Sequence, residues 1–89
     1  MVNVNGTAAL RDHLAARREL PPPTERRAIR EKAGVTRTQV AKAVGVSRQC
    51  IAFWEAGLRT PRDAYLEAYM EVLQLLRRFI AEERPGDAT

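Results

Sequence analysis

The fold is decided by residues 34–57, which read GVTRTQVAKAVGVSRQCIAFWEAG. Thr36 has a glutamine three residues after it, the spacing of a capping box, in which two side chains bond the first backbone N–H groups of a helix. Gly45 stands where that helix must end, because glycine adopts a left-handed backbone conformation at least cost. Ser47 is suited to cap a second helix, and Gly57 to end it. Two capped helices separated by about three residues predict a helix-turn-helix.

The apolar residues of each predicted helix lie on one face. Val40, Ala41 and Val44 are spaced as one side of the first helix. Ile51 and Trp54, three residues apart, form the inward side of the second. The rest of the chain has no alternating strand pattern, and its 89 residues suffice for one modest helical core. We therefore predict an all-α, single-domain protein.

The complete string of motif residues extends on both sides of the two helices. It consists of Gly34, Thr36, Val40-Ala41, Val44-Gly45-Val46-Ser47, Ile51, Trp54-Glu55 and Gly57, with Arg30 before it and Arg59 and Pro61 after it. This string resembles the phage-repressor-like (Cro/C1, XRE) family of bacterial and phage DNA-binding proteins, over roughly residues 24–76. The resemblance implies a lambda-repressor-like helix-turn-helix bundle of about five helices, here with an extra N-terminal helix and an extended C-terminal helix.

The second motif helix is the candidate reader of DNA bases. In a helix-turn-helix this helix enters the major groove with its N-terminus first. Arg48 and Gln49 are therefore expected to contact bases, since arginine can bond guanine, and glutamine adenine, through two hydrogen bonds. Ala52 and Phe53, one turn further along, are candidates for contacts with thymine methyl groups. The alternatives are an ordinary solvent-exposed helix surface for the first pair and a subunit contact for Phe53.

A second group of residues is expected to contact the phosphate backbone. The family usually has a glutamine after the cap of the first motif helix, whereas this chain has Arg37. A phosphate contact is the expected role of that arginine, at a helix N-terminus that also favours anions. The family's loop after the recognition helix lies along the backbone, which implies the same role for Arg59. The expected phosphate contacts are Arg37, Lys42, Ser47, Arg59 and Arg62.

The resemblance also implies a structural ion pair between Arg30 and Glu55, which would tie the helix before the motif to the end of the recognition helix. Glu55 directly follows the inward-facing Trp54, so its carboxylate needs a partner that offsets the loss of water. Cys50 stands beside Ile51 and has no evident histidine or second cysteine to make it a nucleophile or a redox sensor. We expect it to pack as a small residue.

The N-terminal segment, residues 1–23, is expected to hold one helix and a proline-rich connector. Thr7 is a candidate cap for this helix, after a frayed start at residues 1–6. His13 is interpreted as a polar surface residue in preference to a pH switch. Pro21-Pro22-Pro23 is interpreted as an extended connector in preference to a ligand for an SH3-type domain.

The helix-turn-helix domain is assigned to residues 24–83. Thr24 is the expected cap of its first helix. Thr60 is the expected cap of its last helix, with Pro61 at the first helical position, where a missing N–H costs nothing. Residues 84–89 are expected to form a disordered tail.

The last helix carries two apolar stripes. The first is expected to close over the helix-turn-helix and consists of Leu66, Tyr69, Met70, Leu73, Leu76 and Ile80. The second stripe lies beside it and consists of Tyr65, Val72, Leu75 and Phe79. A helix this broadly apolar cannot leave both stripes in water, so the second must meet the N-terminal helix, another subunit, or both. We interpret the second stripe as a dimer or partner surface.

Charge is distributed unevenly along the chain, whose net charge is +4. Residues 24–62 hold nine Lys and Arg against three Glu, whereas residues 63–89 hold three Arg against six acidic residues. The positive excess therefore lies on the helix-turn-helix, where a polyanion would dock, although ordinary solubility charge is the alternative. One cysteine excludes an internal disulfide, and no apolar run is long enough to span a bilayer. A cytoplasmic protein without a membrane partner is expected.

These observations favour a sequence-specific DNA-binding transcriptional regulator, a repressor of bacterial or phage origin that binds double-stranded DNA as a homodimer. The alternative is an antitoxin-like or adaptor protein whose last helix binds a different protein. An enzyme is not expected, because the carboxylates are scattered and no glycine-rich phosphate loop is present. Neither His13 nor Cys50 has the partners of a catalytic triad or a metal site, so we expect no cofactor.

Overall fold

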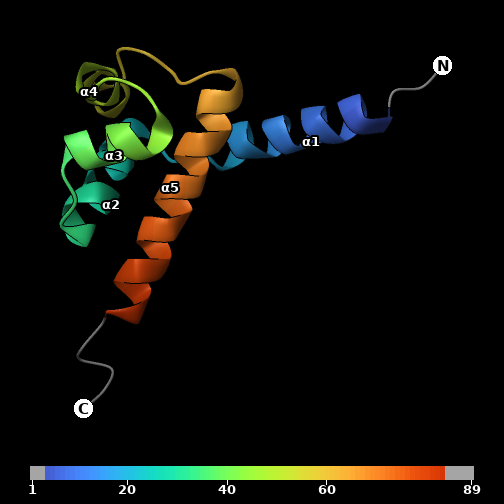
Figure 1. The fold of residues 1–89 in the computed structure, drawn as a ribbon. Helices are drawn as coiled ribbons and strands as arrows, with labels where there is room; N and C mark the ends of the chain where they lie inside the picture. Colours follow the sequence, from blue (N-terminus) through green and yellow to red (C-terminus); the bar gives the residue numbers. More distant parts are fainter. Residues whose placement is uncertain (1–3, 84–89) are drawn as a thin grey trace.

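The computed structural model describes residues 4–83, and every regular element in this range is an α-helix. The helices are α1 (Val4–Glu19), α2 (Pro23–Ala33), α3 (Arg37–Val44), α4 (Arg48–Ala56) and α5 (Asp63–Glu82). In Figure 1, α2, α3 and α4 lie together on one side of α5, and α1 projects from the other side. The prediction of an all-α bundle of about five helices, with one extra helix at the N-terminus, is confirmed.

The core lies between the helix-turn-helix and the first apolar stripe of α5. Trp54 and Tyr69 meet at its centre, with ring centroids 4.8 Å apart. Cys50 is partly buried and packs against this core, as expected for a small residue. The buried apolar residues are Ile29, Val40, Ala41, Val44, Ile51, Trp54, Leu66, Tyr69, Met70, Leu73 and Leu76. The inward faces predicted for the motif helices are therefore confirmed, as is the burial of the first stripe except at Ile80, which is only partly buried against the core.

The caps of the two motif helices follow the sequence pattern. The backbone N–H of Gln39 donates to Thr36 Oγ1 at 3.1 Å, and the N–H of Thr36 donates to Gln39 Oε1 at 2.8 Å, which completes the capping box. Ser47 Oγ accepts from the N–H of Cys50 at 3.1 Å at the start of α4. Gly45 ends α3 with φ 92°, a conformation that only glycine adopts without strain. These short-range contacts fix the orientation of the turn between the helices.

Three predicted helix starts are wrong. α1 begins at Val4, so Thr7 lies one turn inside the helix instead of capping it, because a helix that has formed extends at little cost per residue. Residues 4–6 are consequently helical rather than frayed, and residues 1–3 lie outside the described range. α2 begins at Pro23 with Pro22 as its N-cap, so the cap lies two residues before Thr24. A proline at the first helical position has the right φ and loses no hydrogen bond there.

The start of α5 is also displaced, from Pro61 to Asp63. Pro61 is buried in the loop, Arg62 is extended, and Asp63 has a left-handed φ of 55°. The chain thus turns sharply at the first residue of the helix, and Arg62 stands at the cap position in place of Thr60. The expected disordered tail, residues 84–89, lies outside the described range.

The proline connector packs against the end of α4. Pro21 is buried, and its C=O accepts from Arg26 Nε at 2.7 Å. The other end of the Arg26 guanidinium donates from Nη1 to the C=O of Trp54 at 3.0 Å. A Cβ added to Gly57, the residue that ends α4, would approach Pro23 Cγ to 3.1 Å. The connector is therefore joined to the recognition helix through a buried arginine, whose pKa burial lowers.

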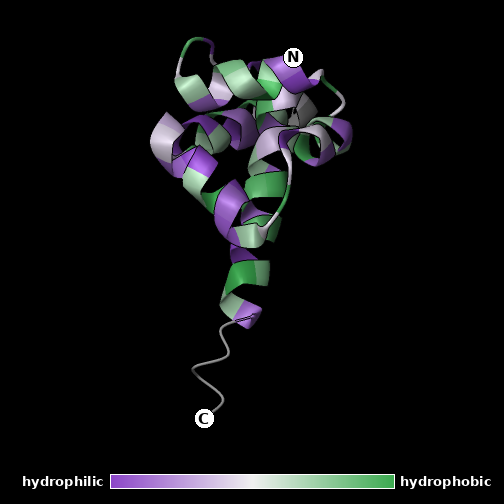
Figure 2. Cartoon of the chain, turned by 90° about the vertical axis from the view of Figure 1, so that its left-hand side faces the viewer, coloured by the Kyte–Doolittle hydropathy of each residue, from purple (hydrophilic) through white to green (hydrophobic). Residues whose placement is uncertain are grey.

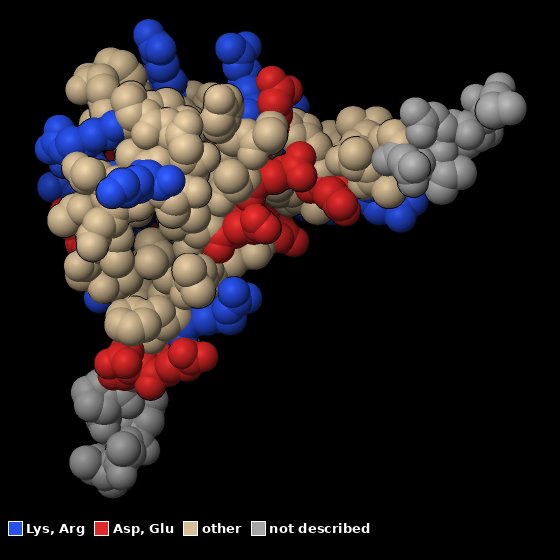
Figure 3. Space-filling model, in the orientation of Figure 1, with Lys and Arg blue, Asp and Glu red and all other residues tan. Residues whose placement is uncertain are grey.

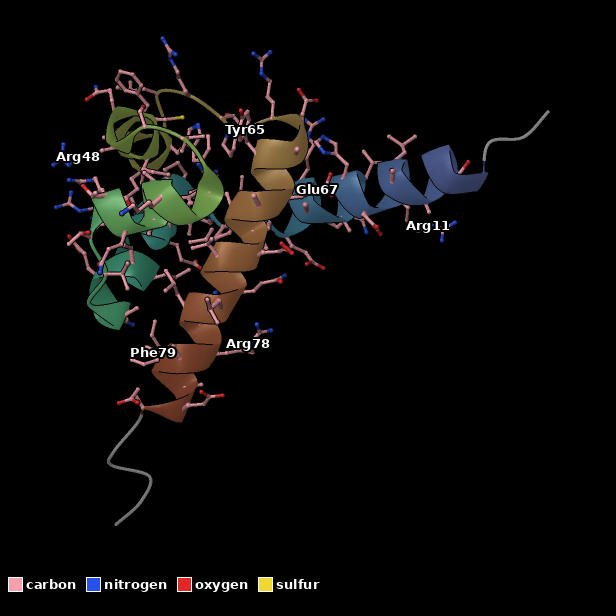
Figure 4. The ribbon with its side chains drawn as sticks, in the orientation of Figure 1. Arg11, Arg48, Tyr65, Glu67, Arg78 and Phe79 are labelled. Atoms are coloured by element: carbon pink, nitrogen blue, oxygen red, sulfur yellow. The ribbon has the colours of Figure 1, made fainter. Side chains whose placement is uncertain are left out.

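α1 contacts α5 without covering the second stripe. His13 Nδ1 lies 3.6 Å from Glu67 Oε2, and the His13 side chain is only 25% exposed, so this residue is not a plain surface group. Figure 4 shows Glu67 on the side of α5 that faces α1, and Tyr65 and Phe79 on the other side. Tyr65, Leu75 and Phe79 remain 51%, 56% and 43% exposed. The N-terminal helix is therefore not the partner of the second stripe.

Candidate nucleic-acid interface

The N-terminal end of α4 faces outward. Ser47, Arg48 and Gln49 are all exposed, whereas Ile51 and Trp54 on the opposite side of the helix are buried. In Figure 4 the Arg48 side chain lies at the outer edge of the molecule, on the side formed by α3 and α4. The polar side chains that can form hydrogen bonds with base edges are thus accessible at the tip of the helix.

Ala52 and Phe53, one turn further along α4, are partly buried. The guanidinium carbon of Arg59 lies 5.0 Å from the centroid of the Phe53 ring, within the range of a cation–π contact. One part of this ring is therefore covered by an arginine from the following loop.

The expected phosphate-contacting residues differ in their accessibility. Lys42, Ser47, Arg59 and Arg62 are exposed. Arg37 is different, because its Nε donates to Glu55 Oε1 at 3.0 Å and its side chain is only 28% exposed. Glu55 is therefore a structural partner of Arg37 that the sequence did not indicate, and the other N–H groups of the guanidinium take no part in this bond.

Glu55 is the centre of a buried ion-pair network. Arg30 Nε donates to Glu55 Oε2 at 2.5 Å, and Arg30 Nη2 donates to Glu55 Oε1 at 3.1 Å. Arg30 Nη1 also donates to the C=O of Val35 at 2.9 Å. The hydrogen bond with Glu55, opposed by burial, raises the pKa of Arg30. The network joins α2, the start of α3 and the end of α4, and so fixes the recognition helix within the bundle.

Positive groups gather around the start of α3 and α4. Arg30, Arg37 and Arg48 line one shallow depression together with the N-terminal residues of α3, and Glu31 is the acidic residue in its lining. Figure 3 shows Lys and Arg side chains on the side formed by α3 and α4, and Asp and Glu side chains where α5 meets α1. The helix N-terminus adds its own partial positive charge to this depression, which makes it a favourable place for an anion.

Two buried residues have polar groups whose surroundings the sequence pattern did not predict. Arg26 binds the two backbone carbonyls described above. The Tyr69 hydroxyl is buried and has no hydrogen-bond partner among the described residues. Burial, followed by the nearby Glu55 charge, raises the pKa of Tyr69 to about 12. The helical spacing of Tyr69 indicated burial, but nothing in the sequence indicated an unpartnered hydroxyl.

The described part of the chain offers neither a group of metal ligands nor a membrane-spanning helix. No group of His, Cys, Asp or Glu side chains within residues 4–83 could hold a metal ion. None of the five helices is both long and apolar enough to cross a membrane.

The comparisons with known proteins bear on the helix-turn-helix itself. A family model described as helix-turn-helix matches residues 27–78, which is more than half of the chain and runs from α2 into α5. No curated protein and no solved structure matches the chain. The matched range contains the capped helices, the buried Trp54 and the exposed start of α4. The chain therefore belongs to the Cro/C1-like (XRE) helix-turn-helix family of DNA-binding regulators.

Proposed function

We propose that the protein is a sequence-specific transcriptional repressor of bacterial or phage origin, which occupies an operator as a homodimer. The observation that carries this proposal is the exposed N-terminal end of α4, where the side chains of Arg48 and Gln49 are both accessible to solvent. A buried network behind them holds the helix in place, because Glu55 at its far end is bonded to Arg30 and Arg37. A preorganised helix loses little freedom on binding.

Arg48 and Gln49 would read the bases. Arginine recognises guanine through O6 and N7, and glutamine recognises adenine through N6 and N7. Ala52, one turn further from the tip, would contact a thymine methyl group, which suits a small apolar side chain. Each good bidentate contact distinguishes the correct base from the wrong one by about 1–3 kcal/mol.

The phosphate contacts would set the register of the protein on the duplex. Lys42, Ser47, Arg59 and Arg62 are exposed and supply them directly. Arg37 lines the depression beside Arg48, and the N–H groups of its guanidinium other than Nε would donate to a phosphate there. Phosphate contacts bind all sequences alike and weaken as the salt concentration rises.

The homodimer is supported by the second stripe. Its three most exposed members, Tyr65, Leu75 and Phe79, are apolar side chains on α5 that no other part of residues 4–83 covers. Figure 2 shows hydrophobic residues continuing into the end of α5 that extends beyond the other helices. A single helix-turn-helix unit buries little surface on DNA, whereas two units about a dyad read two half-sites one helical turn apart.

The second candidate function is that of an antitoxin-like or adaptor protein, in which the second stripe binds a different protein. The same exposed side chains favour it, because an apolar surface of this kind does not distinguish between partners. The mass of the purified protein at micromolar concentration separates the two. Twice the chain mass of 10.0 kDa supports the homodimer, and a stable monomer supports the different partner.

The experiment that tests the proposed function is selection of bound duplexes from a random pool. The protein should enrich a palindromic sequence whose half-sites are about 10 base pairs apart, centre to centre. The variant with Arg48→Ala and Gln49→Ala should enrich no sequence. Arg78→Ala is the matched control, because this exposed arginine lies on α5 away from α4 and its loss should leave the enriched sequence unchanged. A pool that stays random with the unaltered protein would contradict the proposal.

A further inference from the structure

Phe53 and Arg59 form one structural unit at the exit of the recognition helix. The guanidinium carbon of Arg59 lies 5.0 Å from the centroid of the Phe53 ring. The backbone adds to this contact, because the C=O of Phe53 accepts from the N–H of Leu58 at 3.0 Å and from the N–H of Arg59 at 3.4 Å. The turn between them contains Gly57 with a left-handed φ of 75°. The position of Arg59 is therefore set by Phe53 through both its ring and its carbonyl group.

Within residues 4–83, the charge of Arg59 has no ion-pair partner. Four carboxylates in this range, those of Glu25, Glu31, Glu55 and Glu67, pair with other cations, and no carboxylate in it lies within ion-pair distance of Arg59. The Arg59 side chain is exposed, so the ring contact is what restricts its rotamers. A guanidinium held in this way loses less freedom when it binds an anion than a freely rotating one does.

We infer that Phe53 contributes to DNA binding as a positioning residue, which holds the Arg59 guanidinium against a phosphate of the duplex, and that it does not read a base. This inference rests on the proposed function, since it assigns roles within the same DNA interface. It replaces the base contact expected for Phe53 from the sequence, because part of the ring is occupied by the guanidinium. Phe53 should therefore affect affinity without affecting sequence preference.

The variants separate the ring from the charge. Phe53→Leu keeps an apolar side chain of similar bulk and removes the aromatic face. Phe53→Tyr restores the aromatic face and serves as the conservative rescue. Arg59→Lys keeps the charge at an exposed site, where it cannot disturb the core, but lacks the planar group that lies on the ring. Arg59→Ala removes both, and the double variant with Phe53→Leu completes a cycle.

Affinity is measured by fluorescence anisotropy against the selected duplex, its single-base variants and an unrelated duplex, over a range of salt concentrations. Phe53→Leu should weaken binding to every duplex by about two- to fivefold, the value of an exposed cation–π contact. Phe53→Tyr should bind as the unaltered protein does. Arg59→Ala should weaken binding to all duplexes alike and should reduce the slope of log K against log salt concentration by about one. Adding Phe53→Leu to Arg59→Ala should weaken binding little further. Arg59→Lys should fall between Arg59→Ala and the unaltered protein.

Two results would overturn the inference. The first is a change of base preference at one position in Phe53→Leu, with an unchanged salt slope. The second is full multiplication of the effects of Phe53→Leu and Arg59→Ala, which would show that the two residues act independently.

A measurement without DNA distinguishes this failure from failure of the proposed function. The side-chain protons of Arg59 should resonate upfield in the NMR spectrum of the free protein, because they lie over the face of the Phe53 ring, and Phe53→Leu should abolish that shift. Absence of the shift overturns the positioning of Arg59 directly. If the shift is present but the unaltered protein binds no duplex, the result contradicts the proposed DNA-binding function, and with it the phosphate contact of Arg59.

Discussion

Arg37 Nε donates a hydrogen bond to Glu55 Oε1 at 3.0 Å, so the first residue of α3 is bonded to the end of the recognition helix. The side chain of Glu55 is only 3% exposed, and Arg30 occupies its other contacts. The geometry of the helix-turn-helix therefore depends on one buried carboxylate shared between two arginines. Arg37, an expected phosphate contact, therefore also stabilises the helix-turn-helix through its bond to Glu55.

Arg30→Ala should lower the free energy of unfolding by about 3 kcal/mol, the lower end of the range for breaking a buried ion pair, because Arg37 still contacts Glu55. The melting temperature should fall by more than about 10 °C for a chain of this length. Arg27→Ala is the control, because Arg27 forms an exposed i,i+4 pair with Glu31, and its loss should cost about 0.5 kcal/mol or less. Equal melting temperatures for the two variants would remove the buried pair from the account.

Tyr69→Phe should leave stability at pH 7 unchanged or raise it. The hydroxyl is buried without a partner among the described residues, so its removal ends a desolvation cost and breaks no recorded hydrogen bond. Tyr65→Phe, at an exposed site on the same helix, is the control and should have no effect. A large loss of stability in Tyr69→Phe would mean that the hydroxyl is bonded after all.

Alkaline pH should destabilise the protein through the same residue. The pKa of Tyr69 is about 12 in the folded state, above its usual value of 10.0, so folding favours the protonated form. This contribution is fully present below pH 10 and is lost as the pH rises from about 10 to 12. Chemical denaturation across this range should show a decline, of order 2–3 kcal/mol, that Tyr69→Phe lacks. A variant that declines as steeply as the unaltered protein would assign the effect to other groups.

Arg48→Ala and Arg59→Ala should fail in different ways. Loss of Arg48 should relax the preference at one base pair of the operator by about 1–3 kcal/mol, whereas loss of Arg59 should weaken every duplex to a similar extent. Anisotropy titrations against the operator and its single-base variants separate the two patterns. Identical patterns would contradict the division between base and phosphate contacts.

Leu75→Glu should convert the proposed dimer into a folded monomer, because the leucine is 56% exposed on the second stripe and contributes little to the core. Leu10→Glu, at a similarly exposed apolar site on α1, is the control and should leave the dimer intact. Sedimentation equilibrium gives the mass of each variant, and circular dichroism shows whether it is folded. A dimer that survives Leu75→Glu but is lost with Leu10→Glu would place the interface on α1.

The parts of the fold that were predictable from the sequence are those encoded within three or four residues. The capping box at Thr36, the cap at Ser47 and the glycine after each motif helix are local features, and they set the limits of α3 and α4 correctly. The starts of α2 and α5 each differ by two residues from those expected with Thr24 and Thr60 as caps. At those points the fixed φ of Pro23 and the left-handed turn at Asp63 decide the start, and a threonine side chain does not.

The contacts that were missed connect distant residues. Arg26 reaches the backbone of Trp54, 28 residues away, and Arg37 reaches Glu55, 18 residues away. The bond from Arg26 to the Trp54 carbonyl could not be predicted, because every residue has a backbone carbonyl and the side-chain pattern does not show which one is bonded. The bond from Arg37 to Glu55 was partly predictable, because a buried carboxylate has two oxygens and can accept from more than one arginine. The orientation of α1 relative to α5 also depends on packing between distant residues. The sequence therefore did not decide whether the second stripe meets the N-terminal helix, another subunit or a different protein.

The central claim is that the N-terminal end of α4 is the surface that meets DNA. Amide chemical shifts of the protein, recorded by NMR during titration with the selected duplex, test it most directly. The account predicts the largest shifts at Arg37, at residues 47–53 and at Arg59, with little change along α1. Shifts concentrated on α1 or on the exposed stripe of α5, with α4 unchanged, would contradict it.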